Sequence, residues 1–308
     1  MRRQNKCEPI TGWVVVDKPG GSTSTAVVGK VRCLFKAAKA GHGGTLDPLA
    51  TGILPVALGE ATKVMRFVTR FDKTYQFTVR WGQETDTDDV MGKIISESNK
   101  RPHREEIVAA LGSFDEVLAQ IPPRYSAVWV QGRRAYDLAR QGIDTELAPR
   151  SVQFMGGKVL SMVSADETEM EVTCGTGFYI RALARDLGRM LGTYGHVTAL
   201  RRTRLGIFDE SHSIPLDKLV ALGHSETKTL DLVACLKPLS AVLVGVPTLT
   251  VSDGDAARLR QGQAVVLRSC DAPAQSGEVV AVVAGNPVAL VDYECGEMKP
   301  SRVFNNAG

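Results

Sequence analysis

The hydrophobic and polar positions of this chain follow the period of a strand in some stretches and the period of a helix in others. Residues 12–18 form a nearly continuous apolar run that stops at Pro19-Gly20, which predicts a buried strand. Residues 74–81 alternate apolar and polar positions, as a strand with one covered face does. Further strands are expected within residues 126–131, 158–173, 264–267, 278–283 and 288–291.

Helix signals lie between these runs. Ser22 to Ser24 offer N-cap side chains for a helix that reaches about Phe35, and Pro102 suits the first turn of a helix that reaches Leu111. Strands and helices do not alternate strictly, and no internal repeat is present. The pattern predicts an α+β class, with a mixed or antiparallel central sheet flanked by helices. Further helices are expected over residues 60–71, 133–141 and 179–191.

Residues 40–59 follow neither period. This stretch is rich in glycine and small residues and contains two prolines. It predicts a long irregular segment, and such segments in compact domains are often functional.

The composition of the chain changes near residue 246. Beyond this point, short valine-rich runs are separated by glycine and proline, which is typical of an all-β domain. We expect a larger domain over residues 1–240 and a small barrel-like domain over residues 246–308, joined by a segment around 236–243.

Composition narrows the class of protein. The chain has 308 residues, of which 44% are hydrophobic and 23% charged, as in ordinary globular proteins. No run of roughly 18 apolar residues is present and the N-terminus lacks a signal-peptide pattern, so we expect a cytoplasmic protein with no membrane segment. Six cysteines lie far apart without a Cys-x-x-Cys pair, which predicts reduced thiols and neither a zinc site nor disulfides.

The net charge of +3 is too small to indicate, by itself, that the protein binds nucleic acid. Basic residues nevertheless gather in three places. Each group suits either phosphate contact or an ordinary solvated helix face. The groups are Lys30, Arg32, Lys36 and Lys39; Arg133, Arg134 and Arg140; and Arg201, Arg202 and Arg204.

The most informative stretch is His42–Gly59, HGGTLDPLATGILPVALG. An Asp-Pro pair in a glycine-rich loop is, on its own, a common turn starter. Together with Asp17–Ser24, however, this stretch resembles the TruB family of tRNA pseudouridine synthases, which act on uridine 55. The resemblance covers about residues 10–208 strongly, and the C-terminal part is similar, more weakly, to a PUA-type RNA-binding domain. Further matching blocks follow in order at 73–75, 82–88, 120–127, 132–140, 174–181 and 200–202.

The resemblance implies a fold, a reaction and a partner. It implies the pseudouridine synthase fold with a PUA-like domain, and the isomerisation of uridine 55 in the T-loop of tRNA by a monomer. The reaction has no net redox change, so we expect no cofactor and no metal, in line with a sequence that lacks a dinucleotide fingerprint and a His/Cys ligand cluster. The segment at about 120–150 is the insertion that, in the family, closes over the RNA.

The same resemblance assigns the catalytic residues. Asp47 matches the catalytic carboxylate; whether it attacks C1′ of the ribose, adds to C6 of the base, or assists elimination through a glycal stays open. Arg181 matches the arginine that pairs with this carboxylate and orients it. Tyr75 matches a tyrosine that stacks on the target base and takes a sugar proton. On the residues alone, a helix-surface arginine is an equally good interpretation of Arg181, and a core residue is the better interpretation of Tyr75.

Further residues are assigned to RNA binding. A base must leave its stack before an enzyme can reach it, and His42 matches the histidine that fills the gap. Leu200 is expected to pack on the flipped uracil, with Lys18 and Tyr179 as supporting residues. Arg124 and the insertion's other arginines are expected to contact phosphates and read the shape of the RNA. These are Arg133, Arg134 and Arg140.

Three positions depart from the family's pattern. Trp129 stands where a lysine is common, Trp81 where an aliphatic residue is usual, and Phe178 where threonine is usual. These departures bear on local RNA contacts and not on the chemistry.

The acidic run 86–92 has the look of a calcium loop. Val90 and Met91, however, occupy the fifth and sixth places, where an EF-hand needs an oxygen ligand and a glycine. A turn between strands is the better interpretation.

Two other functions compete with tRNA modification. One is an RNA chaperone that unfolds and refolds the tRNA elbow by binding alone. The other is a guide-RNA-dependent relative that modifies ribosomal RNA with partner proteins. Activity on bare tRNA, and tRNA refolding by an Asp47 variant, would separate the three.

Overall fold

The computed structural model describes residues 9–224, 228–267 and 276–305. Four cysteines in these ranges, Cys33, Cys174, Cys235 and Cys295, are free thiols. Cys7 and Cys270, for which reduced thiols were also expected, lie outside the described residues, as do the outer ends of both expected domains.

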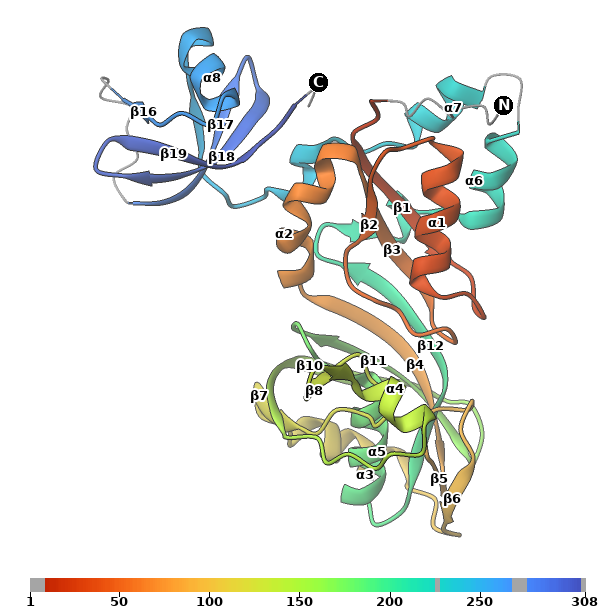
Figure 1. Cartoon of the computed structure of the whole chain (residues 1–308). Coiled ribbons are helices and arrows are strands. Elements are labelled where there is room, and N and C mark those ends of the chain that lie inside the picture. Colours follow the sequence, from red (N-terminus) through yellow and green to blue (C-terminus); the bar gives the residue numbers. More distant parts are fainter. Residues whose placement is uncertain (1–8, 225–227, 268–275, 306–308) are drawn as a thin grey trace.

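A ten-stranded mixed sheet forms the centre of the larger domain (Figure 1). Its main order is β14-β1-β3-β12-β4-β11-β10-β7, with β13 beside β12 and β2 beside β3. The pairs β1–β14 and β3–β12 are parallel and the others antiparallel, so the predicted α+β class is confirmed. The strands are β1 (Gly12–Lys18), β2 (Ala40–His42), β3 (Thr51–Leu58), β4 (Lys73–Trp81), β7 (Val117–Gln120), β10 (Arg150–Met162), β11 (Glu167–Cys174), β12 (Gly195–Leu205), β13 (Phe208–Asp209) and β14 (Ile214–Pro215).

Two hairpins stand beside this sheet. One joins β5 (Gln83–Thr85) to β6 (Ile94–Glu97), so the acidic run between them is a turn, as predicted. The other joins β8 (Trp129–Val130) to β9 (Arg133–Arg134). The helix expected over 133–141 therefore begins later, at Ala135, because the two preceding arginines pair with β8.

Helices cover both ends of the sheet. The helix expected over 60–71 is instead a 3-10 helix followed by one short α-helix; the hydroxyl of Thr62 bonds to the carbonyl of Gly59, three residues back, which is the spacing of a 3-10 turn. The helices are α1 (Ser24–Leu34), α2 (Met65–Arg70), α3 (Arg104–Gly112), α4 (Ala135–Arg140), α5 (Ile180–Met190), α6 (Leu216–Leu222), α7 (Lys228–Ala234), and the 3-10 helices η1 (Gly59–Val64), η2 (Glu210–His212) and η3 (Leu239–Val242).

The expectation of an irregular segment over 40–59 is wrong for its second half, which is strand β3. Residues 53–58 of β3 are buried on both faces, because β3 lies between β1 and β12 and each face is covered by a separate apolar cluster. A strand buried on both faces shows no alternation, so periodicity does not reveal it. Pro55 lies within this strand. Its carbonyl accepts a hydrogen bond from the backbone N–H of Gly43 (2.9 Å).

A smaller five-stranded sheet follows near the C-terminus, in the order β15-β17-β18-β19-β16. The all-β expectation holds for this sheet, to which the structure adds helix α8 (Asp253–Arg260). Val280, Leu290 and Phe304 of this part pack in one apolar cluster with Trp13 of β1, so the two sheets share a core. The strands are β15 (Thr248–Thr250), β16 (Val265–Val266), β17 (Gly277–Val283), β18 (Asn286–Glu294) and β19 (Glu297–Val303).

The long strands β4 and β12 run through the middle of the large sheet and connect its two halves (Figure 1). One half contains β1, β3 and α1, and the other contains β10, β11 and α5. Side chains from the two halves meet where these long strands pass between them. In the described part of the chain, no helix combines the length and the apolar character needed to span a bilayer.

Candidate active site

Asp47 lies in the loop between β2 and β3, and both of its neighbours are tied to the segment that leads into α1. The hydroxyl of Ser24 accepts a hydrogen bond from the backbone N–H of Leu46 (2.9 Å) and donates one to its carbonyl (3.0 Å). The backbone N–H of Gly21 donates to the carbonyl of Pro48 (2.8 Å). The block Asp17–Ser24 is therefore joined to the block His42–Gly59 by hydrogen bonds on both sides of Asp47, and these bonds fix the backbone of Asp47.

Lys18 belongs to this unit and does not touch the solvent. It is fully buried, and its Nζ donates to the carbonyls of Pro19 (2.9 Å), Ser22 (2.7 Å) and Pro48 (3.3 Å). Burial lowers the pKa of Lys18 to about 8, against the opposing effect of Asp47. Lys18 holds the loop and exposes no surface in this structure, which gives no support to the expectation that it binds substrate; that expectation stays a prediction.

Arg181, on the first turn of α5, reaches across from the other half of the sheet. Its Nε lies 2.9 Å from Oδ2 of Asp47, so the two residues form an ion pair. Its other nitrogens donate to the carbonyls of Thr87 (2.9 Å) and Tyr125 (3.0 Å). The guanidinium is nearly buried, whereas the Asp47 side chain is 35% exposed. The arrangement presents one side of the carboxylate to the solvent and anchors the other.

Asp89 completes the surroundings of Arg181, and sequence reasoning assigned it no role. Its Oδ2 lies 3.6 Å from Nη1 of Arg181, while Oδ1 accepts hydrogen bonds from Thr87 (2.7 Å) and from the backbone of Met91 (3.0 Å). The acidic run is thus a turn that also supplies a second counter-ion to the arginine. The family's matching block at 82–88 ends one residue before Asp89, so the sequence carried no signal for this role.

The Asp47 side chain opens into a hollow of about 320 Å³, which is at the lower end of the roughly 300–1,000 Å³ typical of small-ligand pockets. Tyr75 on β4 and Leu200 on β12 line it with apolar surface, and burial raises the pKa of the Tyr75 hydroxyl. Tyr179 lines it as well, and burial raises its pKa too. Five predicted residues therefore meet in one pocket: Asp47, Tyr75, Tyr179, Arg181 and Leu200.

The remaining predicted residues lie outside this pocket. His42 is on β2, where its Nδ1 is buried and has no hydrogen-bond partner within the described ranges; burial, and then Arg202, lower its pKa. Arg133 and Arg140 are exposed, on β9 and at the end of α4. Arg134 lies beside them with its guanidinium over the ring of Trp129.

Two members of the third basic group, Arg201 and Arg202, already bind groups of the protein itself. Arg202 is buried, with Nε donating to the carbonyl of Ile53 (2.8 Å) and Nη2 to that of Gly44 (3.0 Å). Arg201 makes a bidentate pair with Asp17 (3.0 and 2.9 Å). Arg202 thereby holds Gly44, in the loop that contains Asp47, against β12.

The three departures from the family's pattern lie in different surroundings. Trp81 is fully buried and its indole N–H donates to Thr168 (2.8 Å), so it has no contact with RNA. Phe178 lines the Asp47 pocket and stacks on Phe154, with ring centroids 6.2 Å apart. Trp129 is exposed.

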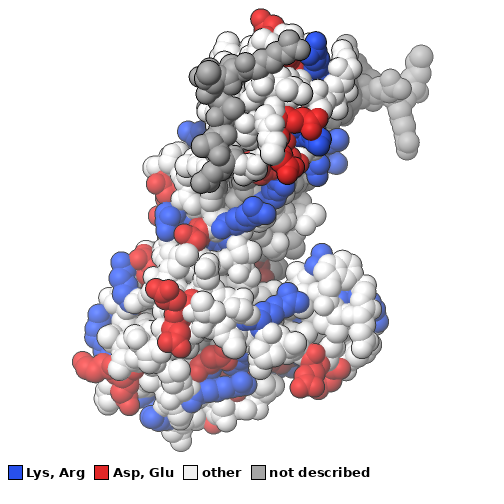
Figure 2. Space-filling model, turned by 90° about the vertical axis from the view of Figure 1, so that its left-hand side faces the viewer, with Lys and Arg blue, Asp and Glu red and all other residues white. Residues whose placement is uncertain are grey.

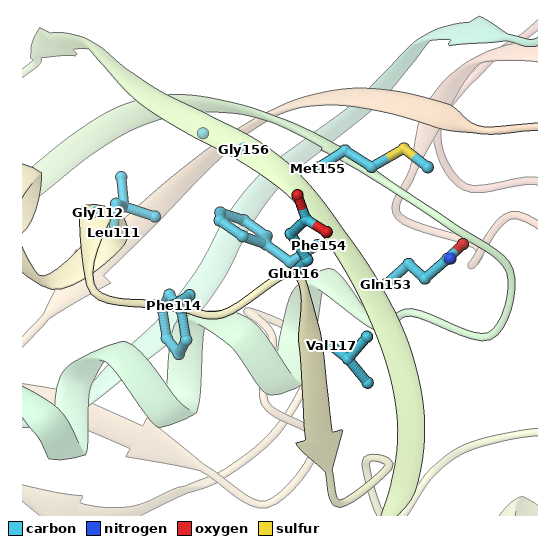
Figure 3. Close-up of a pocket in the computed structure, with 10 residues that line it drawn as sticks. Leu111, Gly112, Phe114, Glu116, Val117, Gln153, Phe154, Met155 and Gly156 are labelled. Atoms are coloured by element: carbon cyan, nitrogen blue, oxygen red, sulfur yellow. The ribbon is translucent and has the colours of Figure 1, made fainter.

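A second hollow of about 530 Å³, which Phe154 helps to line, lies beside β7 and β10 (Figure 3). Phe114 and Phe154 pack edge to face there, with centroids 5.6 Å apart. Its lining contains one carboxylate, Glu116, and no cationic side chain. That lining does not suit the phosphates of RNA, so the smaller hollow beside Asp47 is the better candidate for the active site.

Positive and negative side chains are mixed over the face shown in Figure 2. A surface of this kind does not attract RNA through one large field.

Comparison with known families decides the assignment. The sequence model described as "TruB family pseudouridylate synthase (N terminal domain)" matches residues 32–180. The model described as "tRNA pseudouridylate synthase B C-terminal domain" matches residues 181–244. The chain belongs to the TruB family of pseudouridylate synthases.

Relatives of this TruB chain match it over nearly its whole length. A tRNA pseudouridine synthase B of Bradyrhizobium diazoefficiens is 52% identical over 300 residues, which cover 97% of this chain and 87% of the relative. One of Brucella ovis is 42% identical over 320 residues, covering 98% of both. A crystal structure of the archaeal box H/ACA sRNP Nop10-Cbf5 complex has a TM-score of 0.72 at 23% identity, covers 96% of this chain and 86% of the other, and supports the pseudouridine synthase fold.

Proposed function

We propose that this TruB chain isomerises uridine 55 in the T-loop of tRNA to pseudouridine, with Asp47 as the catalytic residue. One observation carries the assignment of Asp47: its carboxylate opens into the pocket and is paired with Arg181 from the opposite half of the sheet. The relatives named tRNA pseudouridine synthase B support the choice of substrate.

The reaction exchanges one bond for another. The bond between N1 of uracil and C1′ of ribose breaks, the base turns, and C5 bonds to C1′. The hydrogen on C5 leaves to water and N1 gains a proton, so atoms and electrons balance without a redox cofactor. In the three routes that stay open, a carboxylate must reach C1′, C6 of the base, or the proton on C2′ that is lost when a glycal forms.

The pocket supplies what these bond changes need. Tyr75 and Leu200 offer flat and apolar surface to the uracil. Burial raises the pKa of the Tyr75 hydroxyl further above neutral pH, which supports the stacking role of Tyr75 and disfavours its role as acceptor of a sugar proton. Arg181 holds Asp47 through charge while the two carbonyl contacts fix the guanidinium. The carboxylate is therefore aimed before the substrate arrives, which lowers the cost of reaching the transition state.

Base flipping assigns roles to residues outside the pocket. His42 fills the place of the extruded nucleotide, and its lowered pKa favours the neutral ring, which inserts among bases more readily than a charged one. The exposed Arg133 and Arg140, with Arg134, contact phosphates. Residues 1–240 act as the catalytic domain, with the insertion at about 120–150 closing over the RNA, and residues 246–308 as a PUA-like RNA-binding domain; we expect the protein to work as a monomer.

The test uses purified protein and an unmodified tRNA transcript tritiated at uracil C5. The proposal predicts release of one tritium per tRNA, loss of release when uridine 55 is replaced by cytidine, and no need for a guide RNA or partner protein. Absence of release from bare tRNA, with release restored by a guide RNA and partners, would favour the guide-dependent reading. Refolding of tRNA without any release would favour the chaperone.

A further inference from the structure

Trp129 is exposed at the end of a short, rigid hairpin. Trp129 has 58% of its surface exposed to solvent, which is unusual for a tryptophan. The hairpin turn is Gln131-Gly132, with φ of 48° and 81°, the combination of a tight type I′ turn. Trp129 and Arg134 are directly paired across the two strands. The turn and the pairing fix where the indole lies.

One face of the indole is already covered. The guanidinium carbon of Arg134 lies 4.2 Å from the centroid of the Trp129 ring, which is a cation–π contact. Nη1 of Arg134 also donates a hydrogen bond to the carbonyl of Ala127. Arg134 therefore holds the ring in place from one side.

The same contacts connect the hairpin to the active site. Ala127, which accepts the hydrogen bond from Arg134, lines the pocket that contains Asp47. On the buried side of the hairpin, Val128 and Val130 pack with Tyr179, another pocket residue. The indole is thus connected to a pocket residue, Ala127, through the guanidinium of Arg134.

We propose that Trp129 is a stacking platform for a nucleobase next to the target uridine. This inference rests on the proposed function and names one further contact of that site. A nucleobase is the occupant that the surroundings favour: the neighbours Arg133 and Arg140 are exposed cations that suit the phosphates on either side of a base. A lysine at this position, as is common in the family, would contact phosphate; an indole binds the base itself.

The experiment compares Trp129→Ala, Trp129→Phe and Trp129→Lys with the wild type, using tRNA under single-turnover conditions. Removal of one stacking contact raises the half-saturating protein concentration by about 5- to 100-fold and leaves the saturating rate within about twofold. Trp129→Phe keeps most of the affinity because it keeps a ring. The salt dependence of binding is unchanged in Trp129→Ala and steeper in Trp129→Lys, whereas loss of a phosphate contact in Arg133→Ala makes it shallower.

A second measurement, of fluorescence, shows which nucleobase stacks on Trp129. T-arm RNAs carry 2-aminopurine on one or the other side of the target uridine, and stacking on the indole quenches the fluorescence of one of them. Trp129→Ala abolishes that quenching. Wild-type affinity in Trp129→Ala, a shallower salt dependence in that variant, or quenching that survives it would overturn the inference. If the wild type released no tritium from tRNA, that result would instead contradict the proposed function.

Discussion

Two arginines one turn apart on α5 form ion pairs that differ in how completely their hydrogen bonds are satisfied. We call Arg185–Asp88 the closed pair and Arg181–Asp47 the open pair. All three kinds of nitrogen of Arg185 are satisfied: Nη1 with Asp88 (3.1 Å), Nε with Asp186 (2.9 Å) and Nη2 with the carbonyl of Ile121 (2.8 Å). Arg181 satisfies its two terminal nitrogens in the same way, but its Nε, although close to Asp47, has no hydrogen-bond partner among the residues that the structure describes.

This difference in hydrogen bonding distinguishes a pair that only stabilises the fold from a pair whose carboxylate is free to contact a substrate. Asp88 is nearly buried against Arg185, so a substrate cannot reach it. Asp47 keeps part of its carboxylate free, and Arg181 keeps one N–H without a well-directed acceptor. An incompletely satisfied pair beside a pocket fits the role that we propose for Asp47, because part of its carboxylate stays free for a substrate.

The largest effect is expected from breaking the closed pair. Arg185→Ala leaves the Asp88 carboxylate buried without its main counter-ion, and we expect the free energy of unfolding in urea to fall by about 3–5 kcal/mol. Arg80→Ala is the control. Arg80 lies 3.8 Å from Glu167, and both side chains are partly exposed (46% and 27%), so its loss costs at most about 1 kcal/mol. Equal losses in the two variants would contradict the closed-pair account.

A smaller effect, on rate, is expected at the open pair. Arg181→Lys keeps the positive charge but cannot hold Asp47 and two carbonyls at once, because a single ammonium replaces a planar fork. We expect the saturating rate of pseudouridine formation to fall by about 100-fold through misplacement of the carboxylate, with tRNA affinity changed by less than about threefold. Rapid-quench kinetics would measure both. A full rate in Arg181→Lys would show that charge alone suffices.

The smallest effect is a change in the pH dependence of stability. Burial raises the pKa of Asp88 from 3.8 to about 6, so between these values the folded protein holds a proton that the unfolded chain has released. This contribution to stability is complete below about pH 4 and is lost as the pH rises through about 6, by roughly 1–3 kcal/mol. In Asp88→Asn that part of the decrease should vanish. Urea unfolding between pH 4 and 7 would measure it, and identical profiles for the two proteins would refute the assignment.

Sequence patterns located the two partners of the open pair but not the closed pair. Asp47 and Arg181 were found through blocks of matching residues, and the helix beginning beside Arg181 was predicted from its period. Asp88 and Asp89 looked like part of an acidic turn, because a pairing between residues about a hundred positions apart leaves no local signal. For the same reason, the sequence did not show that Lys18 and Arg202 would be buried.

Packing explains the other differences. Strand β3 was hidden because both of its faces are covered, which removes the alternation on which a strand assignment depends. Trp129 was noticed as a departure from a pattern, but only its cross-strand contact with Arg134 gives it a role.

The most direct test of the account replaces the carboxylate of the open pair by an amide. In Asp47→Asn, single-turnover tritium release from tRNA should fall by at least about 1,000-fold while tRNA binding stays within about threefold of the wild type. Asp186→Asn is the control, since its side chain is also 35% exposed and also pairs with the Nε of an α5 arginine; it should keep the wild-type rate. Tritium release by Asp47→Asn at a rate close to that of Asp186→Asn would contradict the central claim.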